Sequence, residues 1–146
     1  MDIYSLLRQD HQRVRMLFDR LATEEPGDGE TSLHLFDALK RELMIHKEAE
    51  ESTLYAALST LPGISDRIEE ALEEHADIEE LLQELEGVDQ QSDAFVTQLG
   101  ELREEVEHHF GVEEDELFPH AQDLLTDEQA DRLALQMQAK KERLVS

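Results

Sequence analysis

The chain has 146 residues, of which 39% are hydrophobic, and this is enough for one compact domain with a buried core. Its 37 acidic residues outnumber its 13 basic residues, and the formal charge of -24 disfavours nucleic acids and anionic membrane surfaces as partners. Cysteine is absent, which excludes disulfides, thiolate zinc sites and cysteine-ligated iron–sulfur clusters. Any bound metal must therefore use nitrogen and oxygen donors.

The N-terminal stretch "MDIYSLLRQDHQRV" is charged and lacks the apolar segment of a signal peptide. No part of the chain contains a run of about 18 apolar residues, the length at which a membrane-spanning helix becomes a candidate. The sequence therefore predicts a soluble cytoplasmic protein.

Apolar residues recur at helical spacing in four long segments. The predicted core helices cover about residues 2–24, 32–60, 65–86 and 92–118. Thr31 and Ser32 are capping candidates for the second helix, and "LPG" at 61–63 ends it. Gly87 closes the third helix, and Pro119 limits the fourth. Short connections between long helices favour antiparallel neighbours, so we expect an all-α, up-and-down four-helix bundle.

A further helix is predicted after the bundle. "TDEQ" at 126–129 reads as a capping box that opens a helix over about 127–144, packed across the end or the flank of the bundle. The whole chain, 1–146, is expected to form a single domain. The only internal similarity is between "HKEAE" at 46–50 and "HFGVE" at 109–113.

The seven histidines differ in the residues that share their helical face. Four have apolar neighbours three and four positions away and are predicted to point into the core: His11, His46, His75 and His109. His34 and His108 lie among polar residues and are predicted to face solvent. His120 follows Pro119, where helical periodicity no longer predicts direction, and is not assigned.

Two glutamates must share the inward faces, because Glu50 lies one turn beyond His46 and Glu113 one turn beyond His109. Buried carboxylates are costly without a positive partner, and no lysine or arginine occupies a matching inward position. A metal ion or a pair of ions is the economical partner. Imidazole and carboxylate donors suit iron or manganese, and zinc or copper would also be accepted. Two ions bridged by the carboxylates fit the number of donors best.

Two other interpretations use the same residues. A plain helical scaffold could contain hydrogen-bonded core histidines without any metal. A ferritin-like carboxylate oxidase requires two Glu-x-x-His motifs, whereas this chain has only Glu105 with His108, on a polar face.

Four segments, taken in order, resemble the hemerythrin-like (HHE cation-binding) domain family of the bacterial single-domain type: "RQDHQRV", "HKEAEESTLY", "EEHADIEELL" and "HHFGVEEDELFPHA". The resemblance extends over nearly the whole chain. It implies two non-haem iron ions joined by an oxo or hydroxo group, with manganese or zinc as substitutes. It further implies that one ion is held by His11 and His46, that the other is held by His75 and His109, and that Glu50 and Glu113 bridge them.

The chain departs from the oxygen-carrying members of this family at two positions. Glu79 stands where they have a further histidine, and Glu113 follows its histidine by four residues, where they have an aspartate five residues on. The His75 iron would then have an extra open position or take Glu79 as an anionic ligand. Tyr55 lies nearly opposite His46 on a regular helix and is interpreted as a core or ligand-supporting residue.

The resemblance implies small diatomic ligands or peroxide as partners. We expect the centre to bind dioxygen, nitric oxide or peroxide, with reactions of peroxide or nitric oxide favoured over reversible oxygen carriage. Catalase- or peroxidase-like turnover would suit such a centre. The alternative is an iron- or oxygen-sensing module, or an iron-storage module, without turnover.

Overall fold

The structure is a computed structural model that describes residues 1–23 and 29–145, together with the side chains of these residues except those of 29–32. The N-terminal half contains α1 (Ile3–Thr23), α2 (Gly29–Glu50), the π-helical turn η1 (Glu51–Tyr55) and α3 (Ala56–Leu58). The C-terminal half contains α4 (Ser65–Glu86), α5 (Asp93–Val112), the π-helical turn η2 (Glu113–Leu117), α6 (Phe118–Leu124) and α7 (Asp127–Val145).

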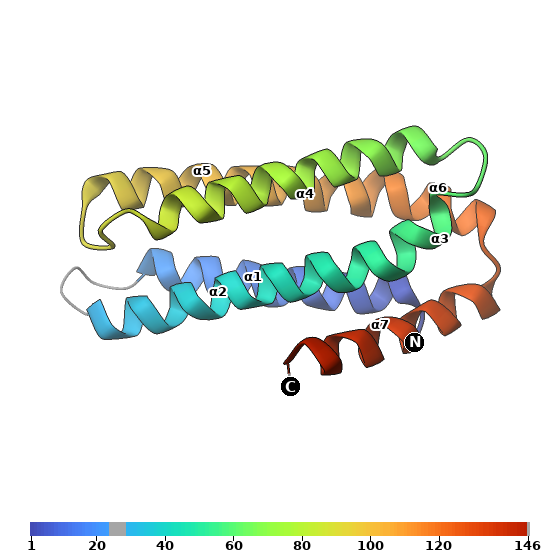
Figure 1. The fold of residues 1–146 in the computed structure, drawn as a ribbon, viewed down its shortest axis with the longest axis horizontal. Coiled ribbons are helices and arrows are strands. Elements are labelled where there is room, and N and C mark those ends of the chain that lie inside the picture. The colour runs from blue at the N-terminus through green and yellow to red at the C-terminus, as the bar shows by residue number, and fades with distance from the viewer. Residues whose placement is uncertain (24–28, 146) are drawn as a thin grey trace.

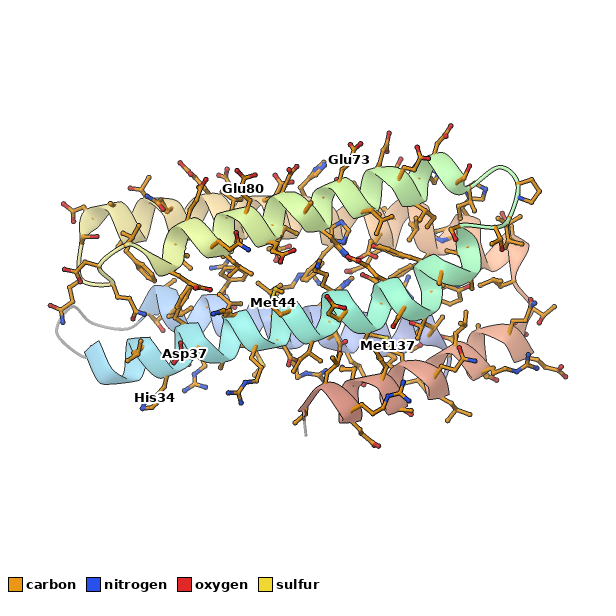
Figure 2. All side chains as sticks on the ribbon, in the orientation of Figure 1. His34, Asp37, Met44, Glu73, Glu80 and Met137 are labelled. Atoms are coloured by element: carbon orange, nitrogen blue, oxygen red, sulfur yellow. The ribbon has the colours of Figure 1, made fainter. Side chains whose placement is uncertain are left out.

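The long helices α1, α2, α4 and α5 lie side by side along the long axis of the molecule, and consecutive ones run in opposite directions (Figure 1). The predicted all-α bundle is confirmed. The fifth helix, α7, folds back along the flank and packs on α1, α2 and η1 (Figure 1). Acidic side chains such as Glu73 and Glu80 project from the outer side of α4 (Figure 2). Within the described residues, no helix combines the length and apolar character needed to cross a membrane.

Local hydrogen bonds explain several helix boundaries. Ser92 caps α5 by accepting a hydrogen bond from the backbone N–H of Phe95. The predicted capping box of α7 is confirmed, because Thr126 accepts from the N–H of Gln129 and the Gln129 side chain accepts from the N–H of Thr126. Gly63, with φ of 89°, supplies the left-handed backbone of the turn after α3. The second helix begins at Gly29, before the predicted cap at Thr31.

The fourth long helix continues through Pro119 to Leu124, further than the sequence predicts. The reason is the π-helical turn η2, in which the N–H of Phe118 bonds to the carbonyl of Glu113, five residues earlier. Pro119 then occupies the first turn of α6, where its missing N–H and fixed φ are tolerated. The wider turn thus allows the helix to accept a proline that would otherwise end it.

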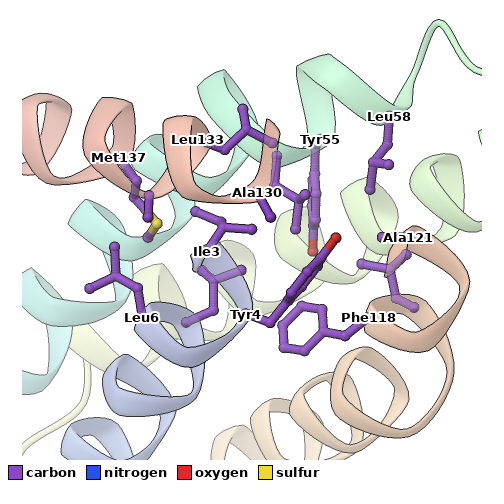
Figure 3. Close-up of a cluster of buried hydrophobic side chains, with 14 of the residues drawn as sticks. Ile3, Tyr4, Leu6, Tyr55, Leu58, Phe118, Ala121, Ala130, Leu133 and Met137 are labelled. Atoms are coloured by element: carbon purple, nitrogen blue, oxygen red, sulfur yellow. The ribbon is translucent and has the colours of Figure 1, made fainter. Parts of the chain in front are cut away.

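The core consists of two hydrophobic clusters separated by a polar layer. The α7-side cluster includes Ile3, Leu7, Leu54, Ala71, Leu117 and Met137, and part of it is shown in Figure 3. The far cluster includes Val14, Leu43, Ile78, Val106 and Phe110. Each core helix, with the turn that continues it, passes from one cluster to the other. Most of the buried polar residues lie between the two clusters: Asp10, His11, His46, Glu50, His75, His109 and Glu113. The apolar packing on both sides therefore fixes the helices that carry these groups.

Candidate metal centre

Four imidazoles and two carboxylates meet in the polar layer between the hydrophobic clusters. His11 comes from α1, His46 and Glu50 from α2, His75 from α4, His109 from α5, and Glu113 from the start of η2. All six side chains are buried. The structure therefore brings together the six residues that the sequence singles out as the main ligands.

The donor atoms form two groups of three, and within each group they lie within 4.8 Å of one another. One group contains His11, His46 and Glu113, and the other contains Glu50, His75 and His109. Oε1 of Glu50 lies 3.4 Å from Nε2 of His46 and 3.2 Å from Nε2 of His75. Oε1 of Glu113 lies 3.3 Å from Nε2 of His11 and 3.2 Å from Nε2 of His109. Each carboxylate thus stands between one histidine of each group.

Each imidazole is held from behind by a second carboxylate that contacts its Nδ1 atom. The pairs are His11 with Glu114 at 3.1 Å, His46 with Asp10 at 2.9 Å, His75 with Glu51 at 2.8 Å, and His109 with Glu74 at 2.7 Å. An ionised carboxylate only accepts hydrogen bonds, so Nδ1 carries the proton and Nε2 faces the centre. Such partners fix the orientation of a ligating imidazole and increase its basicity.

The sequence reasoning missed these four carboxylates, although each is the immediate neighbour of a predicted ligand. Asp10 precedes His11, and Glu74 precedes His75. Glu51 and Glu114 directly follow Glu50 and Glu113. Each supports a histidine on a different helix, so the doubled acids and the acid–histidine pairs are a signal that only the packing of the helices explains.

The electrostatics of the centre favour a cation. Burial lowers the pKa of His46, but the carboxylates of Glu50 and Asp10 outweigh this effect and raise it to about 10. Burial likewise lowers the pKa of His109, while Glu113 and Glu74 raise it to about 10. For Glu113, burial raises the pKa, yet the imidazoles around it hold it well below its usual range. The raised pKa values of the two histidines indicate that, without a metal ion, protons on His46 and His109 supply positive charge to these carboxylates.

Several polar atoms at the centre have no hydrogen bond of acceptable geometry, although imidazoles and carboxylates lie close together. Among the described side chains these include Nε2 of His11, Nε2 of His46, both oxygens of Glu50 and Oε1 of Glu113. An unsatisfied buried polar atom costs about 1–3 kcal/mol, so such a concentration needs an explanation. Nitrogen and oxygen atoms that converge in this way fit a pair of metal ions.

Glu79, the additional ligand considered from the sequence, lies outside both donor groups. Its carboxylate forms a 3.1 Å ion pair with Lys47, and a third of its side chain is exposed. This placement leaves the His75 group without a fourth protein ligand from that position.

Tyr55 lies at the centre rather than away from it. Its hydroxyl donates a 2.6 Å hydrogen bond to Oε2 of Glu113 and lies 3.4 Å and 3.5 Å from Nε2 of His109 and His75. The predicted position of Tyr55 on the side of the helix opposite His46 is wrong. The π-helical turn η1 contains more residues per turn than an α-helix, so the Tyr55 side chain is rotated toward the centre. Burial and the nearby carboxylates of Glu113 and Glu50 raise the pKa of Tyr55 well above 10.

A small cavity of about 20 Å³ adjoins the centre between α2, α4 and α5. His46, His75 and His109 form part of its wall, and the remainder is mostly apolar: Leu43, Met44, Ile78, Leu82 and Phe110. The partly exposed pair of Lys47 and Glu79 completes the lining. A space of this size accommodates a water molecule or a diatomic molecule.

A helical bundle with buried histidines and glutamates of this kind defines a cation-binding domain. The chain belongs to the hemerythrin HHE cation-binding domain family, whose model matches residues 2–121. The resemblance predicted from the sequence is confirmed, and so is metal binding as the general property of such a domain.

Two known proteins are similar to the chain. The crystal structure of a hemerythrin HHE cation binding domain-containing protein, the Rv2633c homolog from Mycobacterium kansasii, has a TM-score of 0.86 and 25% identity, and the match covers 99% of this chain and 87% of that one. A protein from Nostoc sp. (strain PCC 7120 / SAG 25.82 / UTEX 2576) named DNA nickase is 27% identical over 144 residues. The match covers 99% of this chain but only 40% of that protein.

Proposed function

We propose that the chain is a non-haem di-iron protein that binds dioxygen, nitric oxide or peroxide at a carboxylate-bridged pair of irons. The observation that carries this proposal is the position of Glu50 and Glu113, each of which stands between histidines of both donor groups. Carboxylates that touch both groups are suited to bridging two ions. Iron in this position would supply redox chemistry and an open coordination position for a small ligand.

The donor set supports iron as the resident metal. Four imidazoles and two carboxylates, without thiolate, suit iron or manganese, and zinc would also be accepted. One group would hold its ion through His11, His46 and Glu113, and the other through Glu50, His75 and His109.

The remaining residues prepare the centre for a small ligand. The carboxylates on Nδ1 hold each imidazole with Nε2 toward the centre. The adjoining cavity is lined mostly by apolar side chains and leaves room for a diatomic molecule next to His75 and His109. In the metal-free centre Tyr55 keeps its proton on the hydroxyl that donates to Glu113, so an oxygen that can donate a proton or bind a ferric ion lies within the same polar layer.

Metal content tests the proposal directly. Protein loaded with ferrous ion under anaerobic conditions should contain about two irons per chain, one for each donor group. Glu113→Gln and His46→Ala should lose most of this iron, because each removes a donor atom from the centre. His34→Ala is the control, since His34 is exposed and lies outside both groups. Full iron retention by Glu113→Gln would contradict the proposal.

Ligand binding separates a reactive centre from a store. The reduced, iron-loaded protein should change its visible spectrum on exposure to nitric oxide and to peroxide. In oxygen we expect oxidation of the iron rather than stable, reversible oxygenation, because the His75 group offers fewer imidazoles than an oxygen carrier. Repeated consumption of peroxide would show catalase- or peroxidase-like turnover. Iron binding without any response to these ligands would instead support the sensing or storage function.

A further inference from the structure

The C-terminal helix α7 reaches the candidate metal centre through one buried carboxylate. Met137 packs into the α7-side cluster, and Lys141 lies one turn further along the same face of α7. The Lys141 ammonium group donates a 2.5 Å hydrogen bond to Oδ1 of Asp10 in α1. The other oxygen of Asp10 accepts a 2.9 Å hydrogen bond from Nδ1 of His46. A continuous set of charged contacts therefore joins α7 to a predicted ligand.

Asp10 differs from the three other carboxylates that contact an imidazole Nδ1 atom. Glu51, Glu74 and Glu114 keep between 19% and 28% of their side chains exposed, whereas Asp10 is completely buried. Water can solvate the exposed carboxylates, but Asp10 depends on protein cations for compensation of its charge.

Lys141 is the more deeply buried of the two basic side chains on Asp10. The other, Arg13, is half exposed and divides its hydrogen bonds between Asp10 and Glu42. Only 17% of the Lys141 side chain is exposed, and within the described residues its ammonium group donates a hydrogen bond to Asp10 alone. Removal of this amine would leave the negative charge of the buried Asp10 without its cation on the side that α7 covers.

We propose that Lys141 is a positioning residue: by holding Asp10, it fixes the orientation of His46, so that docking of α7 and metal binding by the His11, His46 and Glu113 group favour each other. This inference rests on the proposed function, because it requires the centre to bind metal. The coupling is reciprocal, so the ion should hold α7 against the bundle as strongly as α7 promotes binding of the ion. α7 lies beyond residues 2–121, which the family model matches, so the coupling joins the common core to an additional helix.

Lys141→Met tests the coupling because it keeps most of the length of the side chain and removes only the ammonium group. Competition between the protein and a chelator for ferrous ion should show that one of the two ions is bound about 10- to 100-fold more weakly, while the other is unaffected. Lys141→Arg should restore binding, since it keeps the positive charge. Lys140→Met is the matched control on the same helix. Binding of both ions by Lys141→Met at the wild-type affinity would overturn the proposal.

A double-mutant comparison separates this role from a general loss of stability. Asp10→Asn should weaken the same ion, and the addition of Lys141→Met should then weaken it no further, because the two residues act in series. Losses that simply add would show that Lys141 acts independently of Asp10 and would contradict the proposal.

Hydrogen exchange provides a readout that does not depend on activity. Ferrous ion should slow the exchange of α7 amides near Lys141 in the wild-type protein and in Lys140→Met, but not in Lys141→Met. Equal exchange of α7 in the metal-free and loaded wild-type protein would contradict the coupling, even if the protein binds two irons. A wild-type protein that binds no iron would instead refute the proposed function together with this inference.

Discussion

The Tyr55 hydroxyl is placed as closely to the centre as the predicted ligands are. It lies 3.4 Å and 3.5 Å from Nε2 of His109 and His75, similar to the distances between the predicted ligands themselves. A phenol at this distance can either remain a hydrogen-bond donor to Glu113 or bind a ferric ion through its oxygen. We expect it to bind in the ferric protein, because the oxygen lies beside the two Nε2 atoms that would hold the ion.

Tyr55→Phe should therefore change the spectrum of the ferric protein. We expect a phenolate-to-iron absorption band in the ferric wild-type protein and its loss in Tyr55→Phe, while the iron content stays close to two per chain because both donor groups remain. Tyr4→Phe is the control, since the only other tyrosine packs against Phe118 in the α7-side cluster. Identical spectra of all three proteins would show that the Tyr55 phenol stays a hydrogen-bond donor.

Glu79 and Lys47 form an ion pair and line the cavity beside the centre, so we expect their charges to affect how fast anions reach it. Glu79→Gln should leave the iron content unchanged, because Glu79 lies outside both donor groups. It would also leave the Lys47 ammonium without its 3.1 Å partner, so the anion azide should bind faster, by about tenfold at low salt. Neutral nitric oxide should bind at an unchanged rate. Stopped-flow absorbance measures both rates, and loss of iron in Glu79→Gln would show that Glu79 is a ligand after all.

The predicted ligands could be found from the sequence because the direction in which each side chain points depends on the residues of its own helix alone. His46 and Glu50 share a face with apolar residues three and four positions away, and that is sufficient to predict that they point inward. Their supporting carboxylates could not be found in this way. Asp10 contacts His46 across the α1–α2 interface, and the relative position of two helices along their axes is not encoded in the periodicity of either.

At the scale of secondary structure, two π-helical turns change which side chains of the helices face the centre. η1 follows Glu50 directly, and η2 begins at Glu113. In each, the first residue after the turn bonds five residues back, from Ala56 to Glu51 and from Phe118 to Glu113. Apolar periodicity predicts a helix through both regions but does not reveal the wider turn, because each turn is only five residues long and lies within a longer helical pattern. This is why the sequence misplaced Tyr55 and ended the fourth helix too early.

α7 is expected to contribute substantially to the stability of the bundle. Met137 is completely buried in the α7-side cluster (Figure 3), so Met137→Ala should lower the free energy of unfolding by about 2–5 kcal/mol. Leu135→Ala is the control on the same helix, because Leu135 is 67% exposed and its truncation should change stability by less than about 0.5 kcal/mol. Urea unfolding followed by circular dichroism gives both values. Similar values for the two variants would show that α7 is not part of the cooperative core.

At the scale of the whole molecule, the two halves follow one plan. Each begins with an acid–histidine pair, at 10–11 and at 74–75, and continues with His-x-x-x-Glu-Glu, at 46–51 and at 109–114. A π-helical turn follows in both halves. Only the shorter similarity between 46–50 and 109–113 was singled out from the sequence, because the role of the additional acids depends on contacts between helices.

The two halves differ at two positions that matter for the centre. Tyr55 in the first half corresponds to Phe118 in the second, so the hydroxyl that lies 3.5 Å from His75 and 3.4 Å from His109 has no counterpart at the equivalent position of the second half. Asp10 is covered by α7, whereas its counterpart Glu74 is partly exposed. The two metal positions are therefore predicted to be inequivalent, with the His75 and His109 group next to Tyr55 and the cavity, and the His11 and His46 group connected to α7.

The stability of the whole molecule should depend on pH in opposite ways with and without metal. In the metal-free protein the pKa of His46 and that of His109 rise from 6.5 to about 10, so their stabilising effect is complete below pH 6.5 and is lost as the pH rises toward 10. The pKa of Glu113 lies well below 4.5, so its contribution is present above pH 4.5 and is lost as the pH falls. The metal-free protein should therefore be most stable between about pH 4.5 and 6.5.

Metal binding should reverse the alkaline side of this profile. An ion needs neutral imidazoles, so protons compete with it and its affinity increases as the pH rises above 6.5. The melting temperature of the metal-free protein should fall between pH 6.5 and 9, while the increase caused by a fixed concentration of zinc, which avoids oxidation, should grow over the same range. Thermal unfolding in both forms measures this difference. A melting temperature of the metal-free protein that does not change between pH 6.5 and 9 would show that the histidines are not the source of positive charge in the empty centre.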